Sequence, residues 1–329
     1  MKKMTRRRSL ALGMMGVPGV MGVPGVMLSS PDLMAEPRTL PMSTIFKGKD
    51  KFDKIVAKAV RENWKNYPVS SRMILFAREL HGTPYVNYTL EIDDHIESPS
   101  VNFEGLDCWT FFETTLGLSR MIMRPRAQYS QEDLLREIQW TRYRGGNCSS
   151  CYLDRIHYLA EWFFENEARG NATDITRELG YAQRITGRKI SEMTVLWKHY
   201  RYLRENPDLR APMKKWEDYV ARLPVHYIPK SQVSKIEPKL QDGDIIGIVT
   251  GGHGGFCSHV GITIRTNDKV ARFMHASRNY RKVVIDKSVS GYLNSFRSHA
   301  GIIVGRPLEV DKAVLDPNQY QSNLRRLIG

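Results

Sequence analysis

Residues 244–276 read DIIGIVTGGHGGFCSHVGITIRTNDKVARFMHA. Three short segments of this stretch are rich in Ile, Val and other residues that favour strands, and Gly, Asn and Asp separate them. The segments are Asp244–Thr250, His259–Arg265 and Ala271–Ala276. Turn residues this close together join strands that are neighbours in space, so the stretch predicts a meandering antiparallel sheet.

The predicted sheet continues toward the C-terminus and is preceded by helices. Two further strand-like segments are Lys282–Asp286 and Ala300–Val304. Upstream, apolar residues recur at three- and four-residue spacing, which predicts helices within residues 52–80, 109–123 and 153–223. A run of helices followed by a run of strands is typical of an α+β fold, here a helical lobe packed on an antiparallel β-sheet.

The N-terminus has the charge order of an export signal. Residues 1–8 carry five Lys and Arg side chains, and Ser9–Met27 is uncharged. The run Thr5–Leu10 resembles a twin-arginine signal. An uncleaved membrane anchor is the alternative, but Pro18 and Pro24 make a poor spanning helix. We therefore expect residues 1–35 to direct export to the periplasm or cell envelope, with no stable membrane insertion after their removal.

The remaining chain is expected to form one catalytic domain. Residues 36–49 are expected to be a linker, residues 50–310 the domain, and residues 311–329 a C-terminal tail. The formal charge is +14 for the whole chain and stays at +10 once residues 1–35, with five positive charges and one negative charge, are removed. A basic domain favours association with polyanions such as cell-wall polymers, although solubility alone also explains the charge. No basic block is dense enough to predict nucleic-acid binding, and the sequence gives no indication of the oligomeric state.

The four cysteines are too few for a disulfide scaffold. Cys148 and Cys151 form the one closely spaced pair, which is compatible with a disulfide, with two plain thiols or with half of a metal site. Cys108 stands directly before the long apolar helix predicted at 109–123. The free amide groups at the start of that helix can lower the pKa of the thiol and stabilise a thiolate nucleophile. A buried structural cysteine is the alternative.

Two histidines favour the catalytic interpretation of Cys108. His259 begins one predicted strand and His275 ends the next, with the turn residues 267–269 between them. Adjacent antiparallel strands bring the two imidazoles side by side, so that one can accept the thiol proton and the other can orient it. A cysteine before a helix with two histidines on paired strands is the architecture of a papain-like site.

Several ordered motifs resemble those of the NlpC-type cell-wall cysteine peptidase superfamily. The similarity is strongest to its N-acetylmuramoyl-L-alanine amidase-like branch and spans roughly residues 50–308. The motifs are Gly82–Tyr85, Asp107–Phe111, Gly243–Ile246, Ser258–Ile262 and His275–Ser277, with further matches at Thr89–Glu91, Arg155–Tyr158 and Tyr227–Lys230.

The resemblance implies a peptidoglycan hydrolase that cuts stem-peptide amides or the lactyl–alanine amide and needs no cofactor. It implies Cys108 as the nucleophile, His259 as the general base and His275 as the third, orienting residue. It further implies Tyr85, Asp107 and Ser258 on the substrate and oxyanion side of the site.

Two departures from the family pattern affect substrate preference. The Gly145–Cys151 segment carries the Cys pair at the expected rim of the groove, and Trp109 replaces a smaller residue beside the nucleophile.

One rival interpretation is a zinc site built from Cys257, His259 and His275, with His253 nearby. Others are a thiol-dependent acyltransferase and a non-catalytic wall-binding protein.

Overall fold

The computed structural model describes residues 40–252 and 254–329. The expected signal, residues 36–39 of the expected linker and His253 lie outside the described residues. Within the described residues, no helix is both long enough and apolar enough to cross a membrane.

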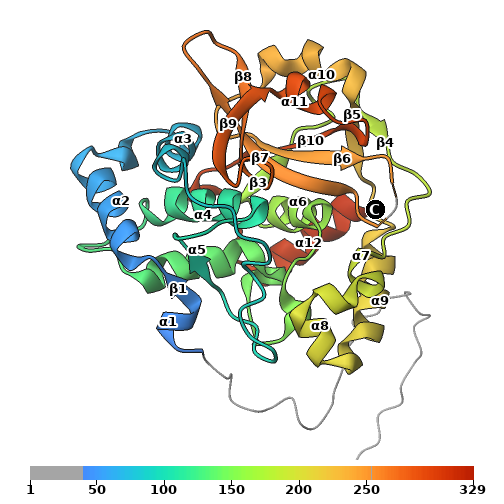
Figure 1. Ribbon diagram of the computed structural model, residues 1–329, viewed down its shortest axis with the longest axis horizontal. Coiled ribbons are helices and arrows are strands. Elements are labelled where there is room, and N and C mark those ends of the chain that lie inside the picture. Colours follow the sequence, from blue (N-terminus) through green and yellow to red (C-terminus); the bar gives the residue numbers. More distant parts are fainter. Residues whose placement is uncertain (1–39, 253) are drawn as a thin grey trace, which may run out of the picture. The chain divides into compact units, whose positions relative to one another are not determined.

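The helical lobe is built by the first half of the chain (Figure 1). It contains the helices α2 (Lys49–Arg61), α3 (Val69–Glu79), α4 (Cys108–Met121), α5 (Gln131–Arg142) and α6 (Leu159–Ala168). Helix α4 is buried on most sides, as predicted, because α3, α5 and the strands β7 and β8 all pack against it. Its one buried acid, Glu113, accepts a hydrogen bond of 2.7 Å from Arg142 of α5, which compensates the charge.

The second half of the chain forms the antiparallel sheet that its sequence predicts. The strand order is β4-β5-β10-β6-β7-β8-β9, with β3 paired to β10. The strands are β3 (Ala172–Asp174), β4 (Gln183–Arg184), β5 (His226–Pro229), β6 (Ile245–Thr250), β7 (Cys257–Arg265), β8 (Ala271–Ser277), β9 (Lys282–Ser288) and β10 (His299–Pro307). The α+β prediction with an antiparallel sheet is therefore confirmed.

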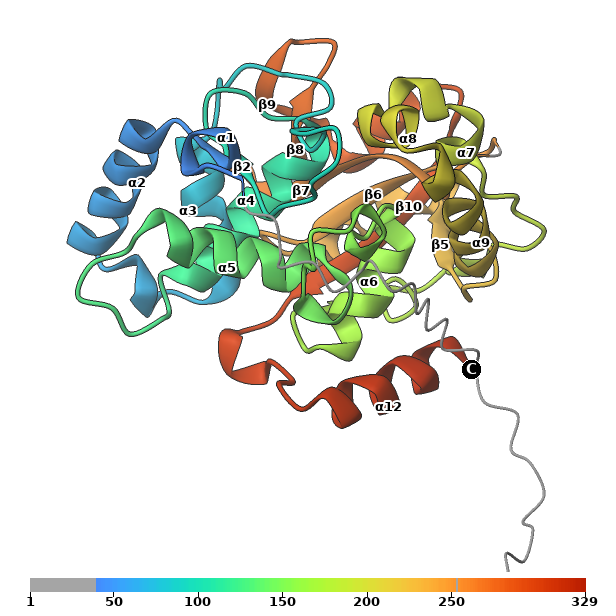
Figure 2. The same ribbon diagram turned by 90° about the horizontal axis from the view of Figure 1, so that it is seen from below.

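Alternate residues of the strands enter two separate cores. Ile245 and Ile303 face the helical lobe, whereas Ile246 and Ile302 face the short helices α10 (Lys230–Ile236) and α11 (Val289–Asn294). This alternation is the period of two that a strand imposes on its side chains. Helices consequently cover both faces of the sheet (Figures 1 and 2).

The prediction of a continuous helical region over residues 153–223 is wrong in part. The region holds α6 and the helices α7 (Glu192–Val195), α8 (Arg201–Glu205) and α9 (Arg210–Val220), but also β3 and β4. Helix α6 ends because Gly170 takes a left-handed backbone with φ of 67°. The chain then enters the sheet, where Thr173 lies opposite Arg306.

Both ends of the described chain pack on the domain. Within the expected linker, α1 (Met42–Ile45) leads into β1 (Phe46–Lys47), which pairs with β2 (Val101–Asn102). Within the expected tail, α12 (Pro317–Ile328) lies beside α6 (Figure 2). Tyr320 of α12 is buried there and donates a hydrogen bond to the carboxylate of Glu165.

Candidate active site

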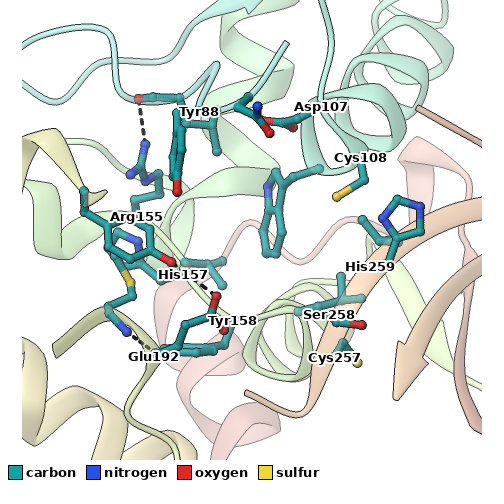
Figure 3. A pocket seen from close by; sticks show the side chains of 18 of the residues that line it. Tyr88, Asp107, Cys108, Arg155, His157, Tyr158, Glu192, Cys257, Ser258 and His259 are labelled. Carbon is teal, nitrogen blue, oxygen red and sulfur yellow. Dashed lines mark hydrogen bonds between the residues drawn. The ribbon is translucent and has the colours of Figure 1, made fainter. Parts of the chain in front are cut away.

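A pocket of about 350 Å³ lies between the start of α4 and the start of β7. Residues 107–109 and 256–260, with Cys108 and His259 among them, line one part of it, and side chains from the segments 85–91, 155–160 and 192–200 line the rest. Figure 3 shows the side chains of Cys108 and His259 next to each other at one side of this pocket. The structure thus brings a thiol and an imidazole together from segments about 150 residues apart in the sequence.

Cys108 is the first residue of α4, and Asp107 fixes the start of that helix. The Asp107 carboxylate accepts the backbone N–H of Thr110 at 2.8 Å, and the Thr110 hydroxyl accepts the backbone N–H of Asp107 at 3.0 Å. Thr89 donates its hydroxyl to the second carboxylate oxygen at 2.7 Å. This reciprocal capping box orients the first turn of α4 and with it the thiol.

The expected lowering of the Cys108 pKa is not found. Burial, followed by the nearby Asp107 carboxylate, raises the pKa of the thiol to about 12. Backbone N–H groups of Val260, Trp109 and Cys108 act in the opposite direction but are outweighed. The sequence prediction considered only the helix end, whereas desolvation of the thiolate is the larger effect here. At rest the thiol is therefore protonated.

The two histidines lie on paired strands and form a hydrogen bond. Ile262 of β7 lies opposite Met274 of β8, so the same register places His259 and His275 at diagonal positions of one sheet face. His259 Nε2 is 2.6 Å from His275 Nδ1. With Nε2 engaged by His275, the other ring nitrogen of His259 remains for the thiol.

Burial holds both imidazoles in the neutral form. His275 is only 1% exposed, and its burial lowers its pKa to about 3. Burial, reinforced by the charges of His275 and His299, lowers the pKa of His259 well below its usual value. Burial thus favours a neutral thiol beside two neutral imidazoles at rest.

Asp286 of β9 extends the pair of histidines and was not among the predicted site residues. Its Oδ2 lies 3.5 Å from His275 Nε2, and its side chain is 9% exposed. The only sequence signal was a carboxylate at the end of the predicted strand Lys282–Asp286, and pattern alone does not tell which strand residue faces His275.

The remaining predicted site residues lie around the thiol. Tyr85 and Ser258 line the pocket, as does Asp107, whose carboxylate is occupied by the cap of α4. Burial, followed by the charges of Cys108 and Asp107, raises the pKa of Tyr85 to about 12. The Tyr85 hydroxyl is therefore a protonated group that can donate a hydrogen bond near the thiol.

The part of the pocket away from Cys108 carries polar and aromatic side chains that the sequence analysis did not assign. Arg155 donates to Glu91 at 2.6 Å, which neutralises both charges in a buried pair. Glu192 accepts a long hydrogen bond of 3.4 Å from the Tyr200 hydroxyl, and burial raises the pKa of Glu192. Tyr88 lines the same region, which suits a polar ligand with some apolar surface.

The other cysteines do not contribute a disulfide. Cys108, Cys148, Cys151 and Cys257 are all free thiols in the described chain. Cys257 lines the pocket, and burial holds its pKa far above that of an ordinary thiol. Across residues 40–252 and 254–329, no group of three or more His, Cys, Asp or Glu side chains is arranged to hold a metal ion.

Comparisons with known proteins relate the chain to amidases. A model of the N-acetylmuramoyl-L-alanine amidase-like family matches residues 75–302. An N-acetylmuramoyl-L-alanine amidase of known structure from Bacteroides uniformis is 30% identical over 73% of this chain and 99% of its own, with a TM-score of 0.66. A putative xylanase from Bacteroides fragilis is 32% identical over 70% of this chain and 98% of its own, with a TM-score of 0.61.

A third solved structure shares the fold at lower identity. This Legionella pneumophila protein of the DUF1460 family is 21% identical, with a TM-score of 0.60 over 82% of this chain and 97% of its own. Among curated proteins, none matches the chain.

Proposed function

Because this chain belongs to the N-acetylmuramoyl-L-alanine amidase-like family, we propose that it is an exported cysteine hydrolase that cleaves amide bonds of peptidoglycan. The family indicates a hydrolase related to peptidoglycan. The finer assignment includes a papain-like, NlpC-type fold for residues 50–310, an export signal in residues 1–35, and a location in the periplasm or cell envelope.

One observation carries the proposed mechanism. Cys108 stands at the start of α4 in the same pocket as His259, and His259 is held from behind by the 2.6 Å hydrogen bond to His275. A nucleophile, a base and an orienting group in this order are the parts of a thiol hydrolase. All three are placed by regular elements, the N-terminus of a buried helix and two paired strands.

The first half of the reaction forms an acyl-enzyme. The free ring nitrogen of His259 takes the thiol proton while Cys108 Sγ attacks the amide carbonyl carbon, and the carbonyl π electrons move to oxygen. The Cys108 backbone N–H and the Tyr85 hydroxyl are the proposed donors to that oxyanion. The C–N bond then breaks, and His259 gives its proton to the departing amine, which leaves a thioester on Cys108.

The second half restores the enzyme. His259 takes a proton from water, and the resulting hydroxide attacks the thioester carbonyl. The C–S bond breaks, the acid product leaves, and the proton returns from His259 to the Cys108 thiolate. Since burial favours a neutral thiol and a neutral imidazole at rest, proton transfer is coupled to attack by Cys108 in the first half.

The proposal is tested with the purified mature protein, intact peptidoglycan and soluble muropeptides, with the products identified by mass spectrometry. Cys108→Ala should abolish turnover. Cys257→Ala, which removes the second thiol of the same pocket, serves as the matched control and should retain activity. Release of an intact stem peptide would assign cleavage of the lactyl–alanine amide, and a cut within the peptide would assign an endopeptidase.

Four outcomes would count against the proposal. Equal activity of wild type and Cys108→Ala would exclude the thiol mechanism, and loss of activity with a chelator would support the rival zinc site. Substrate binding without products from either protein would favour a non-catalytic wall-binding role. Appearance of products only when an acyl acceptor other than water is supplied would favour an acyltransferase.

A further inference from the structure

We propose that Asp286 is a positioning residue that sets the tautomers of both histidines, so that His259 presents a bare ring nitrogen to Cys108. The inference rests on the proposed thiol mechanism and adds a fourth residue to the set of Cys108, His259 and His275. Its basis is the chain of contacts from His259 Nε2 to His275 Nδ1 at 2.6 Å and from His275 Nε2 to Asp286 Oδ2 at 3.5 Å.

The pairing of β8 with β9 places Asp286 where it can face His275, because Val284 lies opposite His275 and Asp286 follows two residues later on the same face. Between the pairs Arg272–Ser288 and Met274–Ile285, β8 advances by two residues and β9 by three. The extra residue lies beside Asp286. A β-bulge therefore adjoins Asp286, and bulges are common next to active sites.

The proton positions follow from the donors and acceptors present. Each neutral imidazole has one N–H and one bare nitrogen, and an ionised carboxylate only accepts. Asp286 therefore requires the proton of His275 to be on Nε2. His275 Nδ1 then accepts, so His259 must donate from its own Nε2, and His259 Nδ1 is left without a proton. This is the one arrangement in which His259 can take the proton of Cys108.

Besides Asp286, the backbone of Ala276 interacts with His275 and raises its pKa, whereas the other side chains nearby do not impose the same order. Tyr292 of α11 packs against the His275 ring with a centroid distance of 5.0 Å, and its pKa is raised by burial and then by the charge of Asp286. Lys287 directs its ammonium to the Ser295 hydroxyl at 3.1 Å. His299 packs against Tyr292 at 5.5 Å, and no hydrogen bond in the described chain joins it to His275.

Asp286→Asn is a sharp test because of a second contact. Asp286 Oδ1 accepts the backbone N–H of Lys287 at 2.7 Å. In the variant, the single amide oxygen is taken by that N–H, and the amide NH₂ turns toward His275 Nε2. A donor at this position requires His275 Nε2 to accept a hydrogen bond, so the His275 proton moves to Nδ1. His275 Nδ1 then donates to His259 Nε2, and the His259 proton moves to Nδ1, which faces Cys108.

The direct measurement is ¹⁵N NMR of the full protein labelled at histidine, with single His→Asn variants to assign His259 and His275. In the wild type, both are expected in the Nε2–H tautomer. In Asp286→Asn, His275 is expected to change to the Nδ1–H tautomer. Asp268→Asn, which removes an exposed carboxylate from the β7–β8 turn, should leave both tautomers unchanged. A wild-type His275 with its proton on Nδ1, or an unchanged tautomer in Asp286→Asn, would overturn the inference.

The kinetic measurement uses soluble muropeptides. Asp286→Asn should lower kcat by about 10- to 100-fold with little change in KM, the size of effect that loss of a supporting group behind a metal-binding histidine has. Asp286→Glu, which keeps an acceptor, should recover part of the loss. A normal kcat in a variant with the changed tautomer would contradict the role in catalysis. If the wild type cleaves no muropeptide, the proposed function fails, yet the tautomers measured by NMR still decide the role of Asp286.

Discussion

Gly261 of β7 and Met274 of β8 approach so closely that a Cβ atom added to Gly261 would lie 2.5 Å from the Met274 carbonyl oxygen. The same Cβ would lie 2.7 Å from the Phe273 ring. Neither neighbour can give way freely, because one is backbone and the other is buried in the sheet core. The absence of a side chain at Gly261 thus lets β8 approach β7 where His259 and His275 meet.

Gly261→Ala is therefore expected to separate the two strands locally. The overpacked side chain should lower the free energy of unfolding by about 1–3 kcal/mol, and a shift of His275 away from His259 should lower kcat as well. Gly252→Ala is the matched control, because nothing lies within 4 Å of a Cβ added there. Urea unfolding and muropeptide turnover measure the two effects, and wild-type values for Gly261→Ala would show that the close approach is not needed.

Asp107→Ala tests whether the helix cap positions the nucleophile. Removing a cap residue costs about 1 kcal/mol of stability. Ser130→Ala removes the equivalent capping box from α5, away from the pocket, and should cost a similar amount. Only Asp107→Ala should also lower kcat, since displacement of a reacting group by about 1 Å costs on the order of 100-fold. Equal turnover in both variants would assign Asp107 a purely structural role.

The neutral resting state of the thiol predicts how Cys108 reacts with iodoacetamide. The thiolate is the reactive form, and the pKa of Cys108 is raised to about 12. The alkylation rate should therefore rise about tenfold per pH unit from about pH 7 to pH 10 without levelling off. Mass spectrometry of the peptide that contains Cys108 separates it from the other three thiols. A rate that is already constant below about pH 7 would instead indicate a thiolate–imidazolium pair.

The sequence predicted those helices and strands whose residue pattern alone indicates the structure that they adopt in the folded protein. Strands β6 to β10 lie within a few residues of their predicted positions because each is a short β-branched segment between turn residues. Strands β3 and β4 were missed because they are short and depend on partners distant in sequence. Residues 311–329 were predicted to be a tail, so helix α12 was missed. One side of this helix is buried, where Tyr320 packs against α6.

In the candidate site, too, the residues with a local sequence signal were predicted, and those that depend on tertiary structure were not. Cys108 was identified from the helix that follows it, and the two histidines were identified from the hairpin that joins their strands. Asp286 was not identified because its position diagonal to His275 depends on how β8 pairs with β9, which the local residue pattern does not show. The direction of the Cys108 pKa shift was wrong because burial is a property of the packed molecule, whereas the helix end is visible in the sequence.

The buried neutral state of His275 also predicts how stability depends on pH. Its pKa falls from 6.5 to about 3 on folding. Below about pH 6.5 the unfolded chain binds a proton that the folded protein does not, so the free energy of unfolding decreases as the pH falls toward 3. The decrease from this residue is about 1.4 kcal/mol per pH unit, or about 2 kcal/mol between pH 6.5 and pH 5. Above about pH 6.5, His275 causes no such decrease in stability.

Urea unfolding of the wild type and His275→Asn at a series of pH values measures this contribution. Between about pH 7 and pH 8 the two stability curves should run parallel, because the histidine is neutral in both states there. Below about pH 6.5 the wild type should lose stability more steeply than the variant, and the difference between the two should shrink as the pH falls. Curves that stay parallel down to pH 5 would mean that His275 binds a proton equally well in the folded protein, and the neutral pair of His259 and His275 would then not exist.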